Sequence, residues 1–315
     1  MDGREYEVSV TAKEVVADGV VVLVLQEAYG EVLPAWEPGA HIDLILENAP
    51  TRQYSLCGDP SDQQTYRLGI LRDDGGRGSS KYIHDSVNVG DNLRIRGPRN
   101  HFQLVPSTDY LFIAGGIGVT PILPMIAHAD EVGADWRLLY GGRKRSSMAF
   151  VDELAKYGDR VRVCPEDEVG SLDLANALAV VGDNTLIYCC GPEPLLLALE
   201  EQCGRALSKV LHIERFAPKD LTEPMLDGAF EVYLTQSDAS MVIPPDRSII
   251  SVLDEAGIYV PSSCSEGTCG TCETPVLEGV PDHRDSILTP DERDANDCMM
   301  LCVSRSCTTR LVLDL

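Results

Sequence analysis

The sequence predicts a multidomain chain: an antiparallel β-barrel, then an α/β domain with a parallel sheet, then a small α+β domain. Three observations support this prediction. Short strand-like segments fill the N-terminal part, strand-like and helix-like segments then alternate, and cysteines with metal-ligand spacing lie near the C-terminus. The 315 residues, of which 44% are hydrophobic, suffice for two or three domains with cores of their own.

Residues 1–105 are expected to form the barrel, because short β-rich segments follow one another there with Gly and Pro between them. This part of the sequence shows no long helical periods. Regular short strands of this kind are typical of small β-barrels. The expected strands are Tyr6–Ala12, Val20–Gln26, Gly39–Leu46, Tyr66–Leu71 and Asn92–Arg96.

Residues 106–222 are expected to form the α/β domain. Buried strand patterns alternate there with helical patterns, which implies a parallel sheet with helices on both faces. The expected strands are Tyr110–Ala114, Trp136–Tyr140, Val161–Cys164 and Thr185–Cys189. The expected helices are Pro121–Ala129, Ala149–Lys156 and Pro194–Cys203, and Leu172–Val180 continues the alternation.

Residues 229–315 are expected to form the third domain, after a linker at Lys219–Gly228 that holds Pro224 and Gly228 and shows little periodicity. The expected elements are a hairpin from Phe230–Leu234 and Met241–Pro244, a helix at Ile249–Ala256, a cysteine-rich loop and a closing strand at Leu311–Leu313.

The cysteine-rich loop indicates a metal centre. Cys264, Cys269 and Cys272 are followed after 29 residues by Cys302, and this C-x4-C-x2-C…C spacing is that of a plant-type [2Fe–2S] cluster. Gly267 and Gly270 provide the tight backbone that such a loop needs. Zinc is the alternative, because C-x2-C is also half of a zinc site, but zinc sites usually combine two close pairs.

The fourth ligand is a choice among three cysteines. Cys302 lies in Met300–Arg305, which resembles the closing segment of plant-type ferredoxins. Cys298 and Cys307 are expected to be ordinary buried thiols. The resemblance therefore implies a β-grasp ferredoxin fold for the third domain, with Cys264, Cys269, Cys272 and Cys302 as the cluster ligands.

Charge and composition exclude several classes. A net charge of −24 argues against binding a nucleic acid backbone. Residues 229–315 alone hold 15 acidic and 5 basic residues, which favours either a partner with a basic surface or simple solubility. The six His show no metal pattern, and no nucleophile–base pair indicates a hydrolase.

The N-terminus reads as a strand rather than a signal peptide, and no apolar run reaches transmembrane length. The chain is therefore expected to be cytoplasmic, with no membrane partner. Its eleven cysteines are expected to serve as reduced thiols and metal ligands.

Two segments of the barrel carry binding motifs. Arg52-Gln53-Tyr54-Ser55 combines a cation, an aromatic ring and a hydroxyl, although a Tyr in an all-β domain is by default a packed strand residue. Gly75-Gly76-Arg77-Gly78-Ser79-Ser80 is a Gly-rich turn that exposes backbone N–H groups and can bind phosphate. A plain hairpin loop is the alternative for the second segment. A helix at Lys81–Val87 would point its N-terminus at that phosphate.

The α/β segment carries a Gly turn between a strand and a helix. Gly115-Gly116-Ile117-Gly118-Val119-Thr120-Pro121 is neither a Rossmann fingerprint nor a P-loop. A Gly turn at a helix N-terminus is nevertheless where a pyrophosphate would bind.

Three shorter segments of this domain are also notable. They are Cys190-Gly191-Pro192, which on its own reads as a buried Cys before a turn; Glu214-Arg215-Phe216, which on its own reads as interface packing; and Tyr140-Gly141-Gly142-Arg143.

Taken in order, these motifs resemble the phthalate dioxygenase reductase and vanillate O-demethylase reductase family, within the ferredoxin–NADP reductase superfamily. The resemblance covers essentially the whole chain. It implies that Tyr54 packs on the flavin ring, that Ser55 donates to the ring near N5, and that Arg52 neutralises the flavin phosphate. The flavin set that it implies is Arg52, Gln53, Tyr54, Ser55, Gly78, Ser79, Ser80, Thr120 and Phe216.

The same resemblance implies a nicotinamide site in which Cys190 lies near the transferred hydride. The implied dinucleotide set is Gly115, Gly116, Gly118, Val119, Pro121, Arg143, Cys190, Gly191 and Pro192, with Ser55, Thr120, Cys190 and Phe216 as the catalytic residues. Arg143 and Arg145 lie where the adenosine half would bind. The family implies NADH as the electron donor. Because either Arg could bind a 2′-phosphate, NADPH remains an alternative donor.

The family implies an oxidoreductase that passes electrons from NADH through FMN and a [2Fe–2S] cluster to a Rieske-type aromatic oxygenase, and it implies a monomer. FMN is favoured over FAD because the compact barrel shows no obvious adenine-binding loop. The alternatives are a reductase for a separate ferredoxin or a di-iron hydroxylase, and a non-enzymatic iron–sulfur and flavin sensor.

Overall fold

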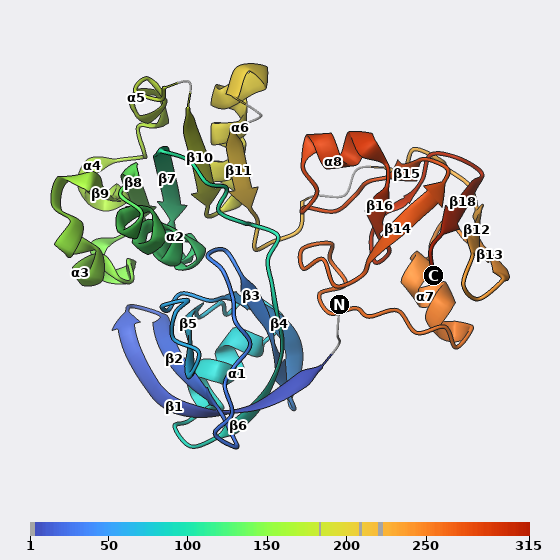
Figure 1. Cartoon of the computed structure of the whole chain (residues 1–315), viewed down its shortest axis with the longest axis horizontal. Helices are drawn as coiled ribbons and strands as arrows, with labels where there is room; N and C mark the ends of the chain where they lie inside the picture. The colour runs from blue at the N-terminus through green and yellow to red at the C-terminus, as the bar shows by residue number, and fades with distance from the viewer. Residues whose placement is uncertain (1–3, 183, 208–209, 220–222) are drawn as a thin grey trace. The chain divides into compact units, whose positions relative to one another are not determined.

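The computed structural model describes residues 4–182, 184–207, 210–219 and 223–315 (Figure 1). The chain divides into two compact units, Met1–Phe216 and Ala217–Leu315. The larger unit holds an antiparallel sheet and a parallel sheet, and the smaller one a mixed sheet. The predicted fold class is therefore confirmed. Of the helices described, none has both the length and the apolar character needed to cross a membrane.

The first sheet is a barrel of six antiparallel strands in the order β4-β3-β6-β1-β2-β5. The two edge strands of this order, β4 and β5, are joined by an isolated antiparallel bridge between Leu56 and Leu68, which closes the ring. The strands are β1 (Glu5–Ala17), β2 (Val20–Glu27), β3 (His41–Leu46), β4 (Ala49–Ser55), β5 (Thr65–Leu71) and β6 (Asn92–Arg99), with helix α1 (Ser79–Ser86) between β5 and β6.

Apolar residues that alternate along the strands build the barrel core. Val8 and Val10 of β1 and Leu23 and Leu25 of β2 are almost fully buried in it. The sequence located five of the six strands. It did not predict β4 as a strand, although this segment carries the Arg52–Ser55 motif.

The second sheet is parallel, in the order β11-β10-β7-β8-β9. The chain runs from β7 to β8 on one side and later returns to β10 on the other. The carboxyl ends of β7 and β10 therefore flank the switch point at which open α/β sheets bind ligands. The strands are β7 (Asp109–Gly115), β8 (Asp135–Gly142), β9 (Val161–Pro165), β10 (Thr185–Cys190) and β11 (Leu211–Glu214), and the longer helices are α2 (Val119–Glu131) and α6 (Glu193–Leu207).

The helix expected at Ala149–Lys156 is shorter than predicted. Helix α3 spans only Val151–Leu154 and continues as a 3₁₀ segment, Ala155–Arg160, in which Gly158 has φ +59°. The segment 172–180 contains helix α5 (Leu174–Leu178), and helix α4 (Glu166–Val169) follows β9.

The smaller unit has a five-stranded sheet in the order β13-β12-β18-β14-β16, in which β12 pairs in parallel with β18. Its elements are β12 (Phe230–Leu234), β13 (Ala239–Ile243), α7 (Ile249–Glu255), β14 (Glu273–Glu278), β15 (Pro281–Asp282), α8 (Pro290–Ala295), β16 (Cys298–Met300), β17 (Arg305–Ser306) and β18 (Arg310–Leu313). The predicted hairpin, helix and closing strand are present. Part of the expected linker, residues 220–222, lies outside the described residues.

Helix α8 was not predicted, although the sequence carries its start signal. The Thr289 hydroxyl accepts the N–H of Glu292, whose carboxylate accepts the N–H of Thr289, and Pro290 occupies the first turn. This is a capping box, which the Thr-x-x-Glu spacing indicates directly. The predicted domain boundaries at 105 and 222 stay predictions.

Candidate functional site

Strand β4 positions the first flavin motif. It pairs with β3 so that Ser55 lies opposite His41 and Gln53 opposite Asp43. Gln53 Nε2 donates to Asp43 Oδ1 over 2.5 Å, so this side chain is held by the barrel itself. Ser55 is 5% exposed, and within the described parts of the chain its hydroxyl has no hydrogen-bond partner. A buried hydroxyl of this kind fits a bound flavin, because the ring would supply the missing partner.

The second flavin segment is fastened to the first. Gly78 has φ +98°, a conformation that favours glycine, and helix α1 begins directly after it. The Ser79 hydroxyl donates to the Pro50 carbonyl of β4 over 2.6 Å, and the Ser80 hydroxyl accepts the Asp73 N–H over 3.0 Å. Both hydroxyls therefore hydrogen-bond to the protein backbone. The N–H groups in the first turn of α1 are the donors that remain available to a phosphate. The helix starts at Ser79, two residues before the predicted start.

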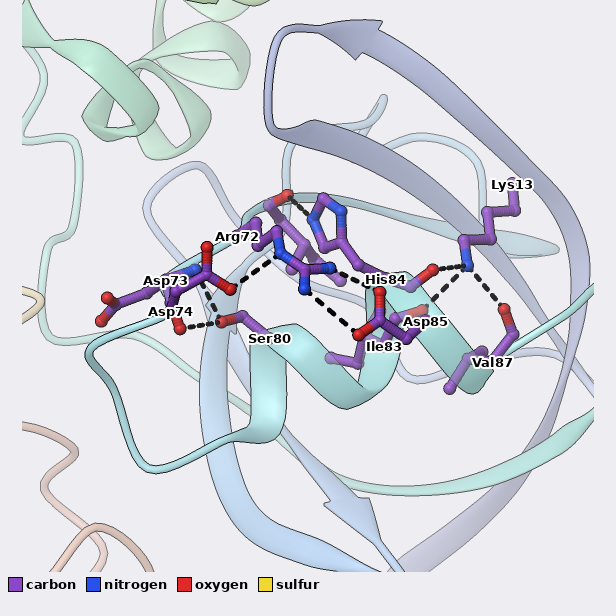
Figure 2. A network of polar contacts seen from close by, with 10 residues as sticks. Lys13, Arg72, Asp73, Asp74, Ser80, Ile83, His84, Asp85 and Val87 are labelled. Carbon is purple, nitrogen blue, oxygen red and sulfur yellow. Dashed lines mark hydrogen bonds and ion pairs between the residues drawn. The ribbon is translucent and has the colours of Figure 1, made fainter.

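A network of polar contacts holds α1 at both of its ends (Figure 2). Lys13 Nζ donates to the carbonyls of Ile83, His84 and Val87 over 2.7–2.9 Å, which caps the helix C-terminus with a cation. Arg72 bridges Asp74 and Asp85. Contacts at both ends therefore hold the helix in position, including its first turn, where a phosphate is predicted to bind.

The Gly turn after β7 brings two strand ends together. A Cβ built on Gly118 would overlap the Cys190 carbonyl, and one on Gly115 would lie 2.6 Å from Pro192 Cδ. Only glycine permits this approach of the turn to the Cys190–Pro192 segment. The predicted dinucleotide residues of the two segments therefore lie side by side at the switch point, with Val119 and Pro121 buried in the first turn of α2. The Thr120 hydroxyl donates to the Ile117 carbonyl over 2.9 Å.

Glu214 is a residue that the sequence analysis named but did not select. It pairs with Cys190 in the parallel register of β10 and β11, and the two side chains hydrogen-bond. Burial raises the pKa of the Glu214 carboxyl to about 8, so this group is mostly protonated near neutral pH. Burial also raises the pKa of the fully buried Cys190 thiol. A signal was present in the sequence: Glu214 directly follows the largely apolar run Val210–Ile213, and a Glu that is buried with such a run needs a protein or ligand partner.

Arg215 and Phe216 have different surroundings. Arg215 is 7% exposed and pairs with Glu193 at 3.1 Å and Glu200 at 2.6 Å, which ties the end of β11 to α6. Phe216 is 46% exposed, so it is available to pack on a ligand.

The two arginines after β8 also differ. Arg145 forms a two-point ion pair with Glu168 of α4, at 2.9 and 3.0 Å. Arg143 is exposed and makes no ion pair within the described ranges. The acidic residues of α4 therefore neutralise one of the two cations at the expected adenosine end.

Four thiols converge in the smaller unit. Cys264, Cys269 and Cys272 are at most 3% exposed. Backbone N–H groups of Glu266 and Thr268 point at Cys264 Sγ over 3.3 and 3.4 Å. The Cys269 and Cys302 thiols also donate to Cys264, which lowers the pKa of Cys264 well below that of a free thiol. Cysteine sulfurs that lie close together, with backbone N–H groups pointing at one of them, match the donor set of an iron–sulfur cluster.

The loop geometry explains why the sequence spacing works. Gly267 and Gly270 have φ +68° and +70°, and a Cβ on Gly267 would lie 2.6 Å from Val303 Cγ2. Because β14 pairs with β16, the residues that follow β16 lie beside Cys272, and the Leu301 N–H donates to the Cys272 carbonyl. This brings Cys302 to the other three thiols.

The remaining two cysteines of this unit lie elsewhere. Cys298 pairs with Pro275 at the far end of the β14–β16 ladder. Cys307 follows β17, and its thiol donates to the Pro281 carbonyl. Cys307 is exposed, which contradicts the expectation that it would be buried.

The comparisons with known proteins address both cofactor domains. The family model described as oxidoreductase FAD-binding domain matches residues 7–104, and the one described as 2Fe-2S iron-sulfur cluster binding domain matches residues 232–311. The phenoxybenzoate dioxygenase subunit beta of Ectopseudomonas oleovorans is 42% identical over 95% of this chain and 94% of its own length. The vanillate O-demethylase oxidoreductase of a Pseudomonas species is 38% identical over 98% of this chain and 99% of its own.

Solved structures extend the likeness to the fold. A solved structure of phthalate dioxygenase reductase matches 99% of this chain and 98% of its own chain, with 34% identity and a TM-score of 0.72. An intact type IV self-sufficient cytochrome P450 monooxygenase matches 99% of this chain with 42% identity and a TM-score of 0.94. The chain spans only 41% of that longer protein.

Proposed function

The chain belongs to the family of flavin- and [2Fe–2S]-containing reductases that includes phthalate dioxygenase reductase, and we propose that it carries electrons from NADH through FMN and the cluster to a terminal oxygenase. The observation that supports this most directly lies in the larger unit. The bridge between Leu56 and Leu68 sets Ser55 across from Gly69, and Thr120 of the dinucleotide turn touches Gly69. Ser55 and the Gly115–Pro121 turn, which is proposed to bind the nicotinamide dinucleotide, thus both lie next to Gly69.

Each residue has a part in the proposed reaction. The Gly115–Pro121 turn binds the dinucleotide, and its glycines let the turn approach Cys190. Ser55 donates a hydrogen bond where negative charge develops during hydride transfer. Glu214, mostly protonated near neutral pH, holds the Cys190 side chain at the same edge of the sheet. A flavin held by these residues would supply the exchange between two-electron and one-electron transfer, which suits a cluster that accepts one electron at a time.

FMN rather than FAD is proposed because the two connections on either side of β4 are short. Strands β4 and β5 are joined by residues 56–64, and β3 and β4 by only two residues. The phosphate-binding end of α1 lies beside β4, as the Ser79–Pro50 hydrogen bond supports. A phosphate bound at this end of α1 would lie close to β4, the proposed ring-binding strand, so the proposal needs no adenine-binding extension.

NADH rather than NADPH is proposed from the charges after β8. A 2′-phosphate would meet Glu166, Asp167 and Glu168 of α4, and Arg145 is already bound to Glu168. Glu168→Gln is expected to release Arg145 and to raise kcat/KM for NADPH relative to NADH about 10- to 100-fold, since a charge-assisted hydrogen bond is worth about 1.5–3 kcal/mol. Steady-state rates with both nucleotides measure the change.

Glu166→Gln is the matched control for this experiment, because it removes the same charge from the same helix and leaves the Arg145–Glu168 pair in place. An equal gain in both variants would attribute the preference to overall charge rather than to Arg145. An unchanged ratio in Glu168→Gln would remove this segment from the account of nucleotide choice.

The proposed partner is a Rieske-type aromatic oxygenase, because the relatives named above belong to dioxygenase and O-demethylase systems. The acidic composition of residues 229–315 suits a partner with a basic surface. A cytochrome P450 haem domain is the second candidate acceptor, since the likeness to the P450 monooxygenase chain spans 99% of this chain.

The visible spectrum of the purified protein, before and after anaerobic NADH addition, tests the proposal. Flavin bands and broad cluster absorbance that bleach together are the expected result. Flavin bleaching without cluster bands would contradict the second half of the electron path. A colourless protein after reconstitution with flavin, iron and sulfide would refute the proposed function altogether.

A further inference from the structure

One glycine of the barrel contacts the dinucleotide domain directly. Gly69 lies in β5, and a Cβ built on it would lie 2.7 Å from Thr120 Cγ2 and 3.1 Å from Phe150 Cζ. Carbon atoms in contact are normally about 3.5–4.0 Å apart. The absence of a side chain at residue 69 is therefore what lets Thr120 and Phe150 lie against the strand.

Phe150 is held in this contact from the barrel side. It is 6% exposed and has φ +62°, an uncommon conformation for a bulky residue. The Arg67 guanidinium lies 4.9 Å from the centre of the Phe150 ring, and it donates two 2.9 Å hydrogen bonds to Glu153 Oε2. The Arg67 side chain and a Cβ built on Gly69 lie on the same face of β5, because alternate residues of a strand share a face. The strand thus fixes the ring and α3 together.

Further contacts prevent the two domains from sliding. The Asp18 N–H, in the turn between β1 and β2, donates to the Ser146 carbonyl over 2.8 Å. Val20, Val22 and Cys57 of the barrel belong to the same buried apolar cluster as Phe150. Separating the domains would expose this shared core, so their spacing is set by packing rather than by a free hinge.

The contact at Gly69 lies between the two groups that the proposed reaction brings together. On one side, the Leu56–Leu68 bridge sets Ser55 across from Gly69. On the other, Thr120 belongs to the turn in which Gly118 abuts the Cys190 carbonyl. A continuous series of contacts thus connects β4, which carries Ser55, through Gly69 and Thr120 to Cys190.

We propose that Gly69 is a positioning residue for hydride transfer: its missing side chain sets the separation between the flavin strand and the nicotinamide turn, and Phe150 with Arg67 maintains it. This inference rests on the proposed function. Hydride transfer needs reacting atoms about 3–3.5 Å apart, and a misplacement of about 1 Å can cost about 100-fold in rate. A change in the spacing at Gly69 should therefore change the rate of hydride transfer directly.

Gly69→Ala tests the proposal in the full-length, flavin-loaded protein. The added methyl group must push Thr120 or Phe150 away, so the limiting rate of flavin reduction at saturating NADH is expected to fall about 10- to 100-fold. The NADH dissociation constant, taken from the concentration dependence of the same stopped-flow traces, should change little. The long-wavelength charge-transfer absorbance of the complex of NAD⁺ with reduced flavin should weaken, because it depends on ring separation.

Two further variants separate positioning from general damage. Gly228→Ala makes the same change where a Cβ meets nothing within 4 Å, and it should leave the rate and the charge-transfer band as in the wild type. Thr120→Ser removes the methyl group that the new Cβ would strike and keeps the hydroxyl. In the Thr120→Ser background, Gly69→Ala should cost much less than in the wild type. Such non-additivity is what direct steric contact produces.

The outcomes distinguish this inference from the proposed function. If NADH fails to reduce the wild-type flavin, the proposed function is wrong. If the wild type is reduced and Gly69→Ala is reduced equally fast, only the positioning role is wrong. A fall in rate with an equal loss of NADH affinity, or equal effects in both backgrounds, would also overturn it. Should Gly69→Ala fail to fold, Phe150→Leu is expected to lower the limiting rate at unchanged NADH affinity, and an unchanged rate would refute the inference.

Discussion

Cys302→Ala is expected to remove the iron–sulfur absorbance from the purified protein and to lower electron delivery to a one-electron acceptor such as cytochrome c. The partly buried Cys302 thiol, which the β14–β16 pairing brings to Cys272, joins the three buried cysteines of the loop. The expected loss exceeds about 100-fold, because even partners outside the first ligand shell cost 10–100-fold when removed. Flavin reduction by NADH should persist, since the residues proposed for it lie in the other unit.

Cys298→Ala is the matched control, because it removes a thiol four residues away at the far end of the same ladder. This variant should keep the cluster bands and the rate of acceptor reduction. Retention of the cluster in Cys302→Ala, or its loss in Cys298→Ala, would show that the ligand assignment is wrong. Iron and acid-labile sulfide analysis of both proteins gives a second, colour-independent measurement.

Ser55→Ala is expected to slow flavin reduction at saturating NADH about 10²- to 10³-fold, the cost of removing one donor aimed at developing charge. The NADH dissociation constant should change much less, because the hydroxyl acts on charge that appears during the transfer. The flavin-free protein should lose no stability, since the Ser55 hydroxyl has no partner within the described part of the chain. Stopped-flow reduction and thermal unfolding measure the two effects separately.

Ser9→Ala serves as the comparison for Ser55→Ala. The Ser9 hydroxyl donates to Asn92 on the exposed side of the barrel, so its loss should leave the reduction rate unchanged. A wild-type reduction rate in Ser55→Ala would eliminate the catalytic role. A drop in thermal stability of the flavin-free variant would point instead to a packing role for this side chain.

Long, periodic elements could be predicted from the sequence, whereas short and polar ones could not. Strands such as β2 and β7 are strongly apolar, and their predicted limits fall within one residue of the observed ones. Strand β4 reads Ala-Pro-Thr-Arg-Gln-Tyr-Ser and lacks an alternating apolar face, so only its pairing with β3 defines it. Strand β16 has three residues and exists through its pairing with β14.

The same distinction applies to the sites. The cysteine spacing is local, so the sequence could predict a cluster loop whose thiols the structure brings together. Glu214 and Gly69 gain their importance from contacts with Cys190 and Thr120, which are distant in sequence. A sequence can indicate that a Glu in an apolar stretch needs a partner, but it does not show which distant residue supplies the contact. The Arg145–Glu168 pair is of the same kind, because it joins the loop after β8 to α4.

The single bridge that closes the barrel has a consequence for its dynamics. Five ladders join the six strands, but β4 and β5 meet only at Leu56 and Leu68, beside the Cys57 to Arg67 backbone hydrogen bond. Local unfolding begins where few hydrogen bonds must break, so this contact between β4 and β5, the seam of the barrel, should open before the other strand pairs. A ligand that bridges Ser55 and its surroundings would hold the seam shut, which links cofactor occupancy to the cohesion of the whole barrel.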